Sequence, residues 1–182
     1  MGAVKKGAVV LFPGVRYSVD TPLLYYAGSA FAQRGYAVLS VDYGDEAQSL
    51  TGLEHTADAL EGPVLDQLRS WQLEQYEDVV FVSKSIGTVL AGRCAQRLGC
   101  AVRHIYLTPL ELTLPYLNRA EDIAVGAGAD PFLDAERLKA HCEAQGVPLR
   151  LYPGVGHRLE DKQDLRRTLD ILGEIVAIYG AF

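Results

Sequence analysis

Short apolar runs alternate along the chain with segments whose apolar residues recur at helical spacing. The runs are rich in β-branched residues, which is typical of strands buried in a sheet. They predict strands over 8–12, 37–41, 78–82, 102–107, 123–127 and 147–152, and the segments between them predict helices over 22–33, 53–73, 88–97, 133–144 and 161–179.

Local signals refine three of these helices. Thr21 followed by Pro22 is a strong start signal, because Thr caps a helix and Pro fits its first position. Pro63 interrupts the apolar spacing of 53–73, so we expect a kink or two abutting helices there. The final helix is amphipathic, and we expect its buried stripe to comprise Leu165, Leu169, Leu172, Val176 and Tyr179.

The regular alternation of strand and helix predicts an α/β fold. Right-handed crossovers then give a three-layer, doubly wound parallel sheet of about six strands with helices on both faces. No internal repeat, low-complexity tract or interdomain linker interrupts the pattern, so we expect a single domain over 1–182.

Composition and charge narrow the possible partners. Of the 182 residues 49% are hydrophobic, which argues against disorder, and no apolar run approaches the roughly 18 residues that span a bilayer. The net charge is −6 and the basic residues are scattered, which argues against nucleic acid. Three cysteines without a CxxC pair suit a reducing compartment, so we expect a cytoplasmic protein.

The segment 83–87, Ser-Lys-Ser-Ile-Gly, lies where the third strand passes into a helix. A serine on such a turn between small residues is the pattern of a nucleophile elbow, usually Gly-x-Ser-x-Gly, although Ser83 here replaces the first glycine. The turn would expose Ser85 and point the first amides of the helix at the space above it. The simpler alternative is that Ser85 only caps the helix.

An aspartate and a histidine at neighbouring strand ends favour the catalytic alternative. Ser85, Asp130 and His157 directly follow the third, fifth and sixth predicted strands, and ligands bind at the carboxyl ends of such strands. A serine hydroxyl becomes nucleophilic when an imidazole takes its proton, and a carboxylate orients that imidazole.

The remaining histidines lie in less suitable places. His55 and His141 fall within helices, and His104 lies inside a strand, where we expect a hydrogen-bonded sheet residue. Asp134 is a rival for the acid, but it is better explained as a charge at a helix N-terminus.

With these motifs in place, the chain resembles a small α/β-hydrolase-fold serine hydrolase over nearly its whole length. It is most similar to the lidless members near the dienelactone-hydrolase-like group, although those with a cysteine nucleophile differ at Ser85. The segments that carry the resemblance are 11–14, 83–87, 128–131 and 156–157.

The resemblance implies roles for individual residues. Ser85 matches the nucleophile, Asp130 the acid and His157 the base. The oxyanion hole would be the amide of Ile86 and one amide of the loop after the first strand, for which we choose Val15, with Arg16 as the next choice. That loop reads Pro-Gly-Val where the family usually has His-Gly-x.

Two family features are absent from the sequence. We expect no antiparallel strand pair before the first parallel strand, where the family commonly has one, and the usual cap position holds only 109–120. The fold is therefore expected to be a minimal α/β-hydrolase core without a cap domain, and the pocket to be shallow and open.

Several side chains are candidates for the substrate pocket. Arg16 and Lys84 could bind an anionic substrate group, or they could be solvated charges at the rim. Glu111 could offset part of their charge. The candidates are Arg16, Tyr17, Tyr43, Lys84, Leu110, Glu111 and Arg158.

These features predict a serine hydrolase that needs no cofactor or metal and cleaves a small carboxylic ester or thioester. Two alternatives stay open: a non-catalytic small-molecule binder on the same fold, and an acyltransferase that uses the same triad. A dinucleotide site at 126–131 is disfavoured, since the third glycine and the acidic residue of that motif are missing. We expect a monomer or homodimer with no nucleic-acid or membrane partner.

Overall fold

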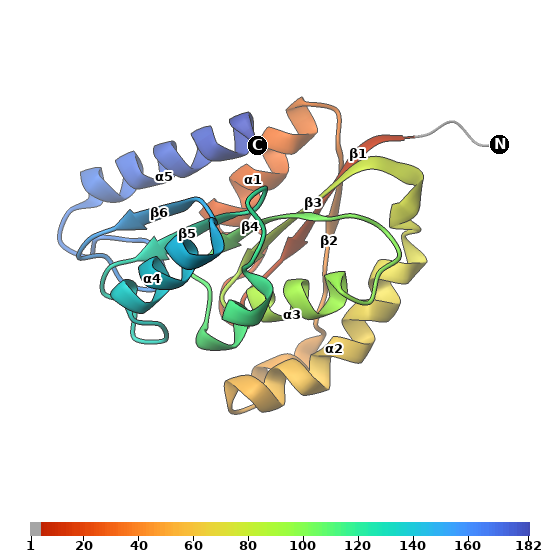
Figure 1. Ribbon diagram of the computed structural model, residues 1–182, viewed down its shortest axis with the longest axis horizontal. Helices are drawn as coiled ribbons and strands as arrows, with labels where there is room; N and C mark the ends of the chain where they lie inside the picture. The colour runs from red at the N-terminus through yellow and green to blue at the C-terminus, as the bar shows by residue number, and fades with distance from the viewer. Residues whose placement is uncertain (1–4) are drawn as a thin grey trace.

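The computed structural model describes residues 5–182, apart from the side chains of Lys5 and Glu46; residues 1–4 of the predicted domain lie outside the described part. Its centre is one parallel sheet of six strands (Figure 1), as the sequence predicts. The strands are β1 (Lys5–Phe12), β2 (Ala37–Ser40), β3 (Tyr76–Lys84), β4 (Arg103–Leu107), β5 (Ile123–Ala127) and β6 (Leu149–Tyr152).

The strand order is β2-β1-β3-β4-β5-β6, so the chain reverses its direction of travel through the sheet between β1 and β3. At such a switch point the loops after two neighbouring strands diverge and leave a crevice at the carboxyl edge. The loop after β1 and the turn after β3, which carries Ser85, border this crevice, while Asp130 and His157 follow β5 and β6 at the same edge of the sheet.

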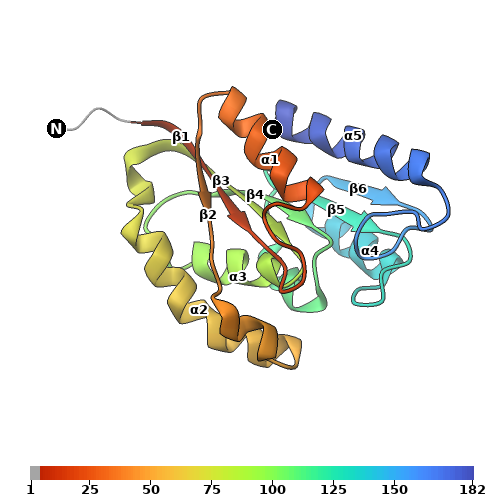
Figure 2. The ribbon, with the colours of Figure 1, turned by 180° about the vertical axis from the view of Figure 1, so that it is seen from behind.

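Helices cover both faces of the sheet. Helices α1 and α5 lie on one face and α2, α3 and α4 on the other, which the two opposite views show (Figures 1 and 2). The predicted three-layer α/β fold is thus confirmed. The helices are α1 (Pro22–Gln33), α2 (Leu53–Ser70), α3 (Ile86–Ala95), α4 (Ala135–Gln145) and α5 (Leu165–Ala181), with 3₁₀ turns η1 (Asp45–Ser49), η2 (Leu73–Gln75) and η3 (Glu111–Tyr116).

The core forms two layers because strand side chains alternate between the faces. In β3, Val80 and Val82 pack toward α1 and α5, whereas Val79 and Phe81 pack toward α2 and α3. β3 is central and buried on both faces, which explains its continuous apolar sequence.

Of the two outcomes expected at Pro63, two abutting helices are not found, because α2 is a single helix over Leu53–Ser70 with Pro63 inside it. Pro63 and the preceding Gly62 are exposed, so the ring lies on the solvent side. Val64 and Leu68 are fully buried on the other side. Tertiary packing of that face outweighs the backbone hydrogen bond that proline cannot donate.

The buried stripe predicted for the last helix is wrong at its start. The helix begins at Leu165 rather than at 161, and Leu165 and Leu169 are 72% and 54% exposed. Ile171 and Ile175 are buried in their place, whereas the predicted Tyr179 is buried and the predicted Leu172 and Val176 are partly buried against the core. Both sets of residues have helical spacing, so the period alone could not choose between them.

No helix within residues 5–182 has both the length and the apolar character that crossing a membrane requires.

Candidate active site

The turn at Ser85 has a strained backbone. β3 ends at Lys84 and α3 begins at Ile86, so Ser85 alone joins strand and helix, with φ 58° and ψ −123°. A positive φ is uncommon for a residue with a side chain and is found where surrounding structure enforces it. The Ser85 amide donates to the carbonyl of Leu107 at 3.1 Å, which ties the turn to β4.

Two glycines allow this turn to pack against the loop that follows β1. A Cβ on Gly87 would lie 2.6 Å from the carbonyl oxygens of both Phe12 and Pro13, so only glycine fits there. A Cβ on Gly14 would lie 3.4 Å from Cβ of Ser85. This close approach brings the Gly14 loop beside the serine.

Ser83, where the usual motif has its first glycine, points into the protein. It is fully buried, and its Oγ donates to the carbonyl of Ile105 at 3.5 Å. Ser85 is partly exposed. The two serines therefore differ in access, as the alternation of strand side chains predicts.

Ser85, His157 and Asp130 form a hydrogen-bonded chain. Oγ of Ser85 lies 2.8 Å from Nε2 of His157, and Nδ1 of His157 lies 2.7 Å from Oδ2 of Asp130. A carboxylate only accepts, so Nδ1 donates to Asp130 and Nε2 accepts the serine proton when the imidazole is neutral. The sequence placed these residues at three strand ends, and the structure brings them together.

The carboxyl group of Asp130 is fixed from its other side. Its side chain is only 4% exposed, and Oδ1 accepts from the amide of Phe132 at 2.9 Å. Asp134, the rival acid, instead caps α4 by accepting from the amide of Arg137 at 3.0 Å. The helix-terminus explanation of Asp134 therefore fits the structure.

The backbone amides of Ile86 and Val15, beside Ser85, have no backbone partner within the described residues, and neither has the amide of Arg16 in the same turn as Val15. Ile86 is the first residue of α3, where the N–H groups of a helix are unpaired and carry partial positive charge. Val15 lies in the tight turn closed by mutual backbone hydrogen bonds between Gly14 and Tyr17. Both are the amides that the sequence analysis chose as oxyanion donors.

Solved structures with similar folds cover nearly the whole chain. A protein from Xanthomonas campestris pv. campestris, proposed to be a hydrolase of the alpha/beta superfamily, is 15% identical with a TM-score of 0.71 and covers 98% of this chain and 100% of its own. A lidless α/β serine hydrolase from Xanthomonas campestris is 18% identical (TM-score 0.64), covering 95% of this chain and 80% of its own. Est1E from Butyrivibrio proteoclasticus, solved with ferulic acid, is 13% identical with a TM-score of 0.71. The match covers 98% of this chain and 88% of the Est1E chain.

This chain has the α/β-hydrolase fold. At identities of 13–18%, these similarities establish the fold and do not establish a particular activity or substrate. No family model matches the sequence, and the search of curated proteins gives no significant match.

In this α/β-hydrolase fold a cavity of about 610 Å³ opens beside Ser85 and His157. One wall comes from the start of α2 and the segment before it, which contribute Leu50, Leu53 and Thr56. The segment 109–120, in the position of a cap, forms η3 against α3 and contributes no residue to the cavity.

Phe132 is a cavity residue that the sequence analysis missed. The Phe132 ring packs edge to face on the His157 ring, with the two ring centroids 4.7 Å apart. Phe132 is 48% exposed and lines the cavity. The sequence feature that could have indicated Phe132 is its place in the same loop as Asp130, two residues further on.

Of the predicted pocket residues, Arg16, Tyr17, Lys84 and Arg158 line the cavity. The Tyr17 hydroxyl accepts from the amide of Leu23 at 3.1 Å, so its ring forms a fixed part of the wall. The guanidinium carbon of Arg158 lies 5.2 Å from the centroid of that ring.

Three predicted pocket residues lie elsewhere, which corrects the sequence analysis. The Tyr43 hydroxyl donates to the carbonyl of Pro13 at 2.8 Å and so stabilises the loop after β1. Leu110 is buried in a small apolar cluster with Ile86. Glu111 forms an exposed ion pair with Arg137. None of the three lines the cavity beside Ser85.

Lys84 is not a solvated charge at the rim. Its side chain is 1% exposed, and Nζ donates to Oγ1 of Thr108 at 2.5 Å and to the carbonyl of His157 at 2.8 Å. Burial lowers the pKa of this amine to about 7, while Asp130 opposes that shift.

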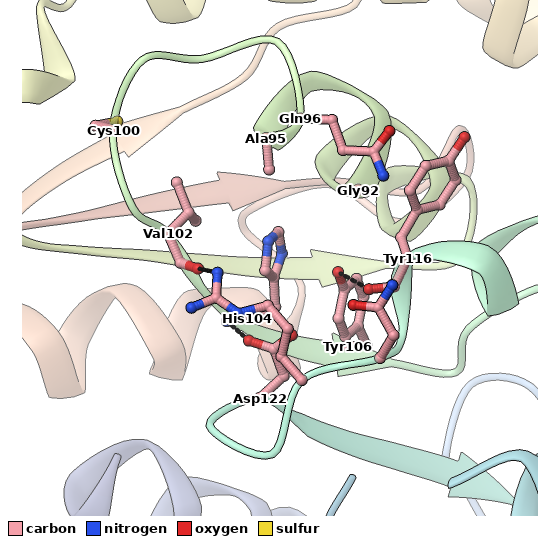
Figure 3. Close-up of a pocket in the computed structure, with 11 residues that line it drawn as sticks. Gly92, Ala95, Gln96, Cys100, Val102, His104, Tyr106, Tyr116 and Asp122 are labelled. Carbon is pink, nitrogen blue, oxygen red and sulfur yellow. Dashed lines mark hydrogen bonds between the residues drawn. The ribbon is translucent and has the colours of Figure 1, made fainter. Parts of the chain in front are cut away.

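A second hollow of about 160 Å³ lies between the C-terminal half of α3, the start of β4 and the segment before β5 (Figure 3). His104 stacks there on Tyr106, with ring centroids 4.7 Å apart. Its Nδ1 is buried without a hydrogen-bond partner in the described residues, so the expectation of a hydrogen-bonded histidine is wrong. Burial lowers the pKa of His104 to about 3, and the ring is neutral at pH 7.

Asp122 belongs to the same hollow. Its Oδ1 accepts from the amide of His104 at 2.8 Å, while Oδ2 is buried and unpaired among the described residues. Burial raises the pKa of this carboxyl to about 6. Neither Asp122 nor His104 lines the cavity at Ser85.

Across residues 5–182, no group of three or more His, Cys, Asp or Glu side chains is arranged to hold a metal ion.

Proposed function

We propose that this protein is a serine hydrolase that cleaves a small carboxylic ester or thioester through an acyl-enzyme on Ser85. The observation that carries the proposal is the hydrogen-bonded chain from Ser85 through His157 to Asp130, at 2.8 and 2.7 Å. It lies on a strained turn whose serine faces a cavity. A serine that merely caps a helix needs neither partner.

In the first half-reaction Ser85 Oγ attacks the carbonyl carbon of the substrate while His157 Nε2 takes its proton. Asp130 holds Nδ1–H and stabilises the imidazolium that forms. The carbonyl oxygen becomes an oxyanion, for which the amides of Ile86 and Val15 are the proposed donors. His157 then gives the proton to the departing alcohol or thiol.

In the second half-reaction water attacks the acyl carbon while His157 Nε2 takes a proton from it. The bond from that carbon to Ser85 Oγ then breaks, His157 returns the proton to Oγ, and the carboxylic acid leaves. An alcohol or amine in place of water would give acyl transfer with the same groups. We favour hydrolysis because the described chain provides no cap over Ser85 that would keep water from the acyl group.

The residues that line the cavity suggest which chemical groups the substrate contains. Val15, Leu53 and Phe132 offer an apolar surface beside Ser85, and Arg16 and Arg158 line the same cavity. Glu160 pairs with Arg158 at 3.1 Å, whereas no ion-pair partner of Arg16 occurs among the described residues. We infer an ester with an apolar body and an anionic group directed at Arg16.

The function is tested by a screen of p-nitrophenyl esters and acyl-CoA thioesters on the wild type and on Ser85→Ala. The wild type is expected to hydrolyse at least one short ester or thioester, and Ser85→Ala to lose this activity while folding normally. A folded wild type that binds such esters without turning them over would instead support a non-catalytic binder. Cytoplasmic location and the absence of a cofactor stay part of the proposal.

A further inference from the structure

Lys84 is a buried ammonium donor directly beside the proposed nucleophile. A lysine that is 1% exposed is unusual, because removing its charge from water is costly. A lysine is retained in a core where its amine donates hydrogen bonds that an apolar side chain could not make. The hydrogen bonds of Nζ indicate what Lys84 contributes to the site.

Nζ of Lys84 connects three segments that lie far apart in the sequence. It donates to Oγ1 of Thr108 after β4 and to the backbone carbonyl of His157 after β6. It also lies 5.3 Å from the centroid of the Tyr17 ring in the loop after β1. With Lys84 at the end of β3, one side chain links the carboxyl ends of four strands.

The contact with His157 is the one with a chemical consequence. His157 lies in a 12-residue connection, 153–164, that contains no helix or strand. Its ring is oriented by Asp130, but a ring has a fixed position only if its backbone is fixed as well. The hydrogen bond from Lys84 to the carbonyl of His157 supplies that second anchor.

Thr108 supports the same interpretation. It has φ 43°, a strained value for a β-branched residue, and it is 1% exposed. Its amide donates to the carbonyl of Val125 at 2.7 Å, which holds it in place. The strained position directs Oγ1 to Nζ of Lys84.

Charges on the neighbouring segments also face Lys84. Asp130 and Glu160 favour its ammonium form and Arg158 disfavours it, while burial lowers its pKa to about 7. The amine can donate to the His157 carbonyl in either protonation state, so the anchor does not require the charge.

We propose that Lys84 is a positioning residue that anchors the backbone of His157, and thereby holds the imidazole against Ser85. The proposal deepens the proposed hydrolase function and rests on it for its kinetic part. The structural part, that Lys84 immobilises the 153–164 connection, stands independently.

The test compares Lys84→Met, which keeps an unbranched side chain of similar size and removes the donor, with Lys139→Met, at an exposed lysine on α4, as the matched control. Lys84→Met is expected to lower kcat by about 10- to 100-fold with little change in KM, because a misplaced base affects the chemical step rather than binding. Hydrogen–deuterium exchange in 153–164 should be faster in Lys84→Met and unchanged in Lys139→Met.

A second variant covers the case in which Lys84→Met does not fold. Thr108→Val keeps the β-branched shape and removes only the acceptor, and it is expected to give a smaller loss of kcat, about 3- to 10-fold, with unchanged KM. Wild-type exchange rates and kcat in both variants would overturn the proposal. An inactive wild type would overturn the hydrolase function, and the exchange measurement would then still decide the anchor.

Discussion

The exposure of Ser85 depends on a single backbone conformation, its φ of 58° between β3 and α3. The spacing of small residues around the serine predicts such a turn, but not the partners that hold it. Gly87 makes the turn possible, because Phe12 and Pro13 leave no space for a side chain. At the residue scale, the spacing of small residues around Ser85 was the most informative feature of the sequence.

Asp130 provides the first test at the residue scale. Asp130→Asn is expected to lower kcat by about 10⁴-fold if the analogy with Ser-His-Asp proteases holds, since the amide no longer fixes the correct tautomer of His157. Asp134→Asn is the matched control, because it lies one turn away and only caps α4. Steady-state kinetics on one ester decide the matter. A larger loss in Asp134→Asn would mean that the acid is wrongly assigned.

Arg16 tests the proposed charge preference of the cavity. A hemisuccinate ester is expected to react about 10- to 100-fold faster in kcat/KM than its methyl-capped neutral partner, since a charge-assisted hydrogen bond contributes about 1.5–3 kcal/mol. Arg16→Gln should remove the preference and leave the neutral ester unaffected. Equal rates on both esters in the wild type would contradict this role of Arg16.

The sequence could place Lys84 beside the nucleophile but could not tell where its side chain goes. A lysine is normally a surface charge, and the burial of Lys84 depends on Thr108 and His157, which are 24 and 73 residues away. Tyr43 and Glu111 were misplaced for a related reason. Each follows a strand end, yet its side chain turns to a partner that no local pattern reveals.

At the scale of elements, hydrophobic spacing predicted the strands within a few residues and the helices with larger errors at their ends. α5 is the clearest case, because two stripes of helical spacing compete for the buried face. Its contact with α1 decides between them, and that contact is not encoded in the period of α5 alone.

Matched truncations in α5 test this assignment. Ile175→Ala removes a fully buried side chain and is expected to lower the free energy of unfolding by about 2–5 kcal/mol. Leu165→Ala removes a side chain that is 72% exposed and should change it by less than about 0.5 kcal/mol. Urea unfolding of both variants gives the comparison. A loss in Leu165→Ala as large as that in Ile175→Ala would contradict the exposed position of Leu165.

For the molecule as a whole, the strand order places the switch point between β1 and β3, and the candidate residues gather at that edge. Strand and helix alternation predicts a parallel sheet, and the carboxyl-edge rule then predicts where Ser85, Asp130 and His157 meet. The order of strands and the wall formed by the start of α2 depend on long-range packing, which the pattern does not contain.

The buried carboxyl of Asp122 makes stability depend on pH. Burial raises its folded pKa to about 6, above its ordinary value of 3.8, so between these values the folded protein holds a proton that the unfolded chain has released. The stability from this group is fully present below about pH 4 and is lost as the pH rises through 6.

Asp122→Asn is expected to avoid this loss and to keep an acceptor for the amide of His104. The free energy of unfolding of the variant, minus that of the wild type, should therefore rise by up to about 3 kcal/mol between pH 4 and 6 and stay constant above. Urea unfolding at a series of pH values measures this difference. A difference that does not change with pH would contradict the raised pKa.

The central claim is that Ser85 is an activated nucleophile, and covalent labelling tests it most directly. A fluorophosphonate reacts with a serine whose proton is taken by a neighbouring base, so the wild type should gain one label, mapped by mass spectrometry of the peptide to Ser85. Ser85→Ala and His157→Ala should fold and remain unlabelled. A wild type that stays unlabelled, or a label that maps to Ser83 or persists in Ser85→Ala, would contradict the account.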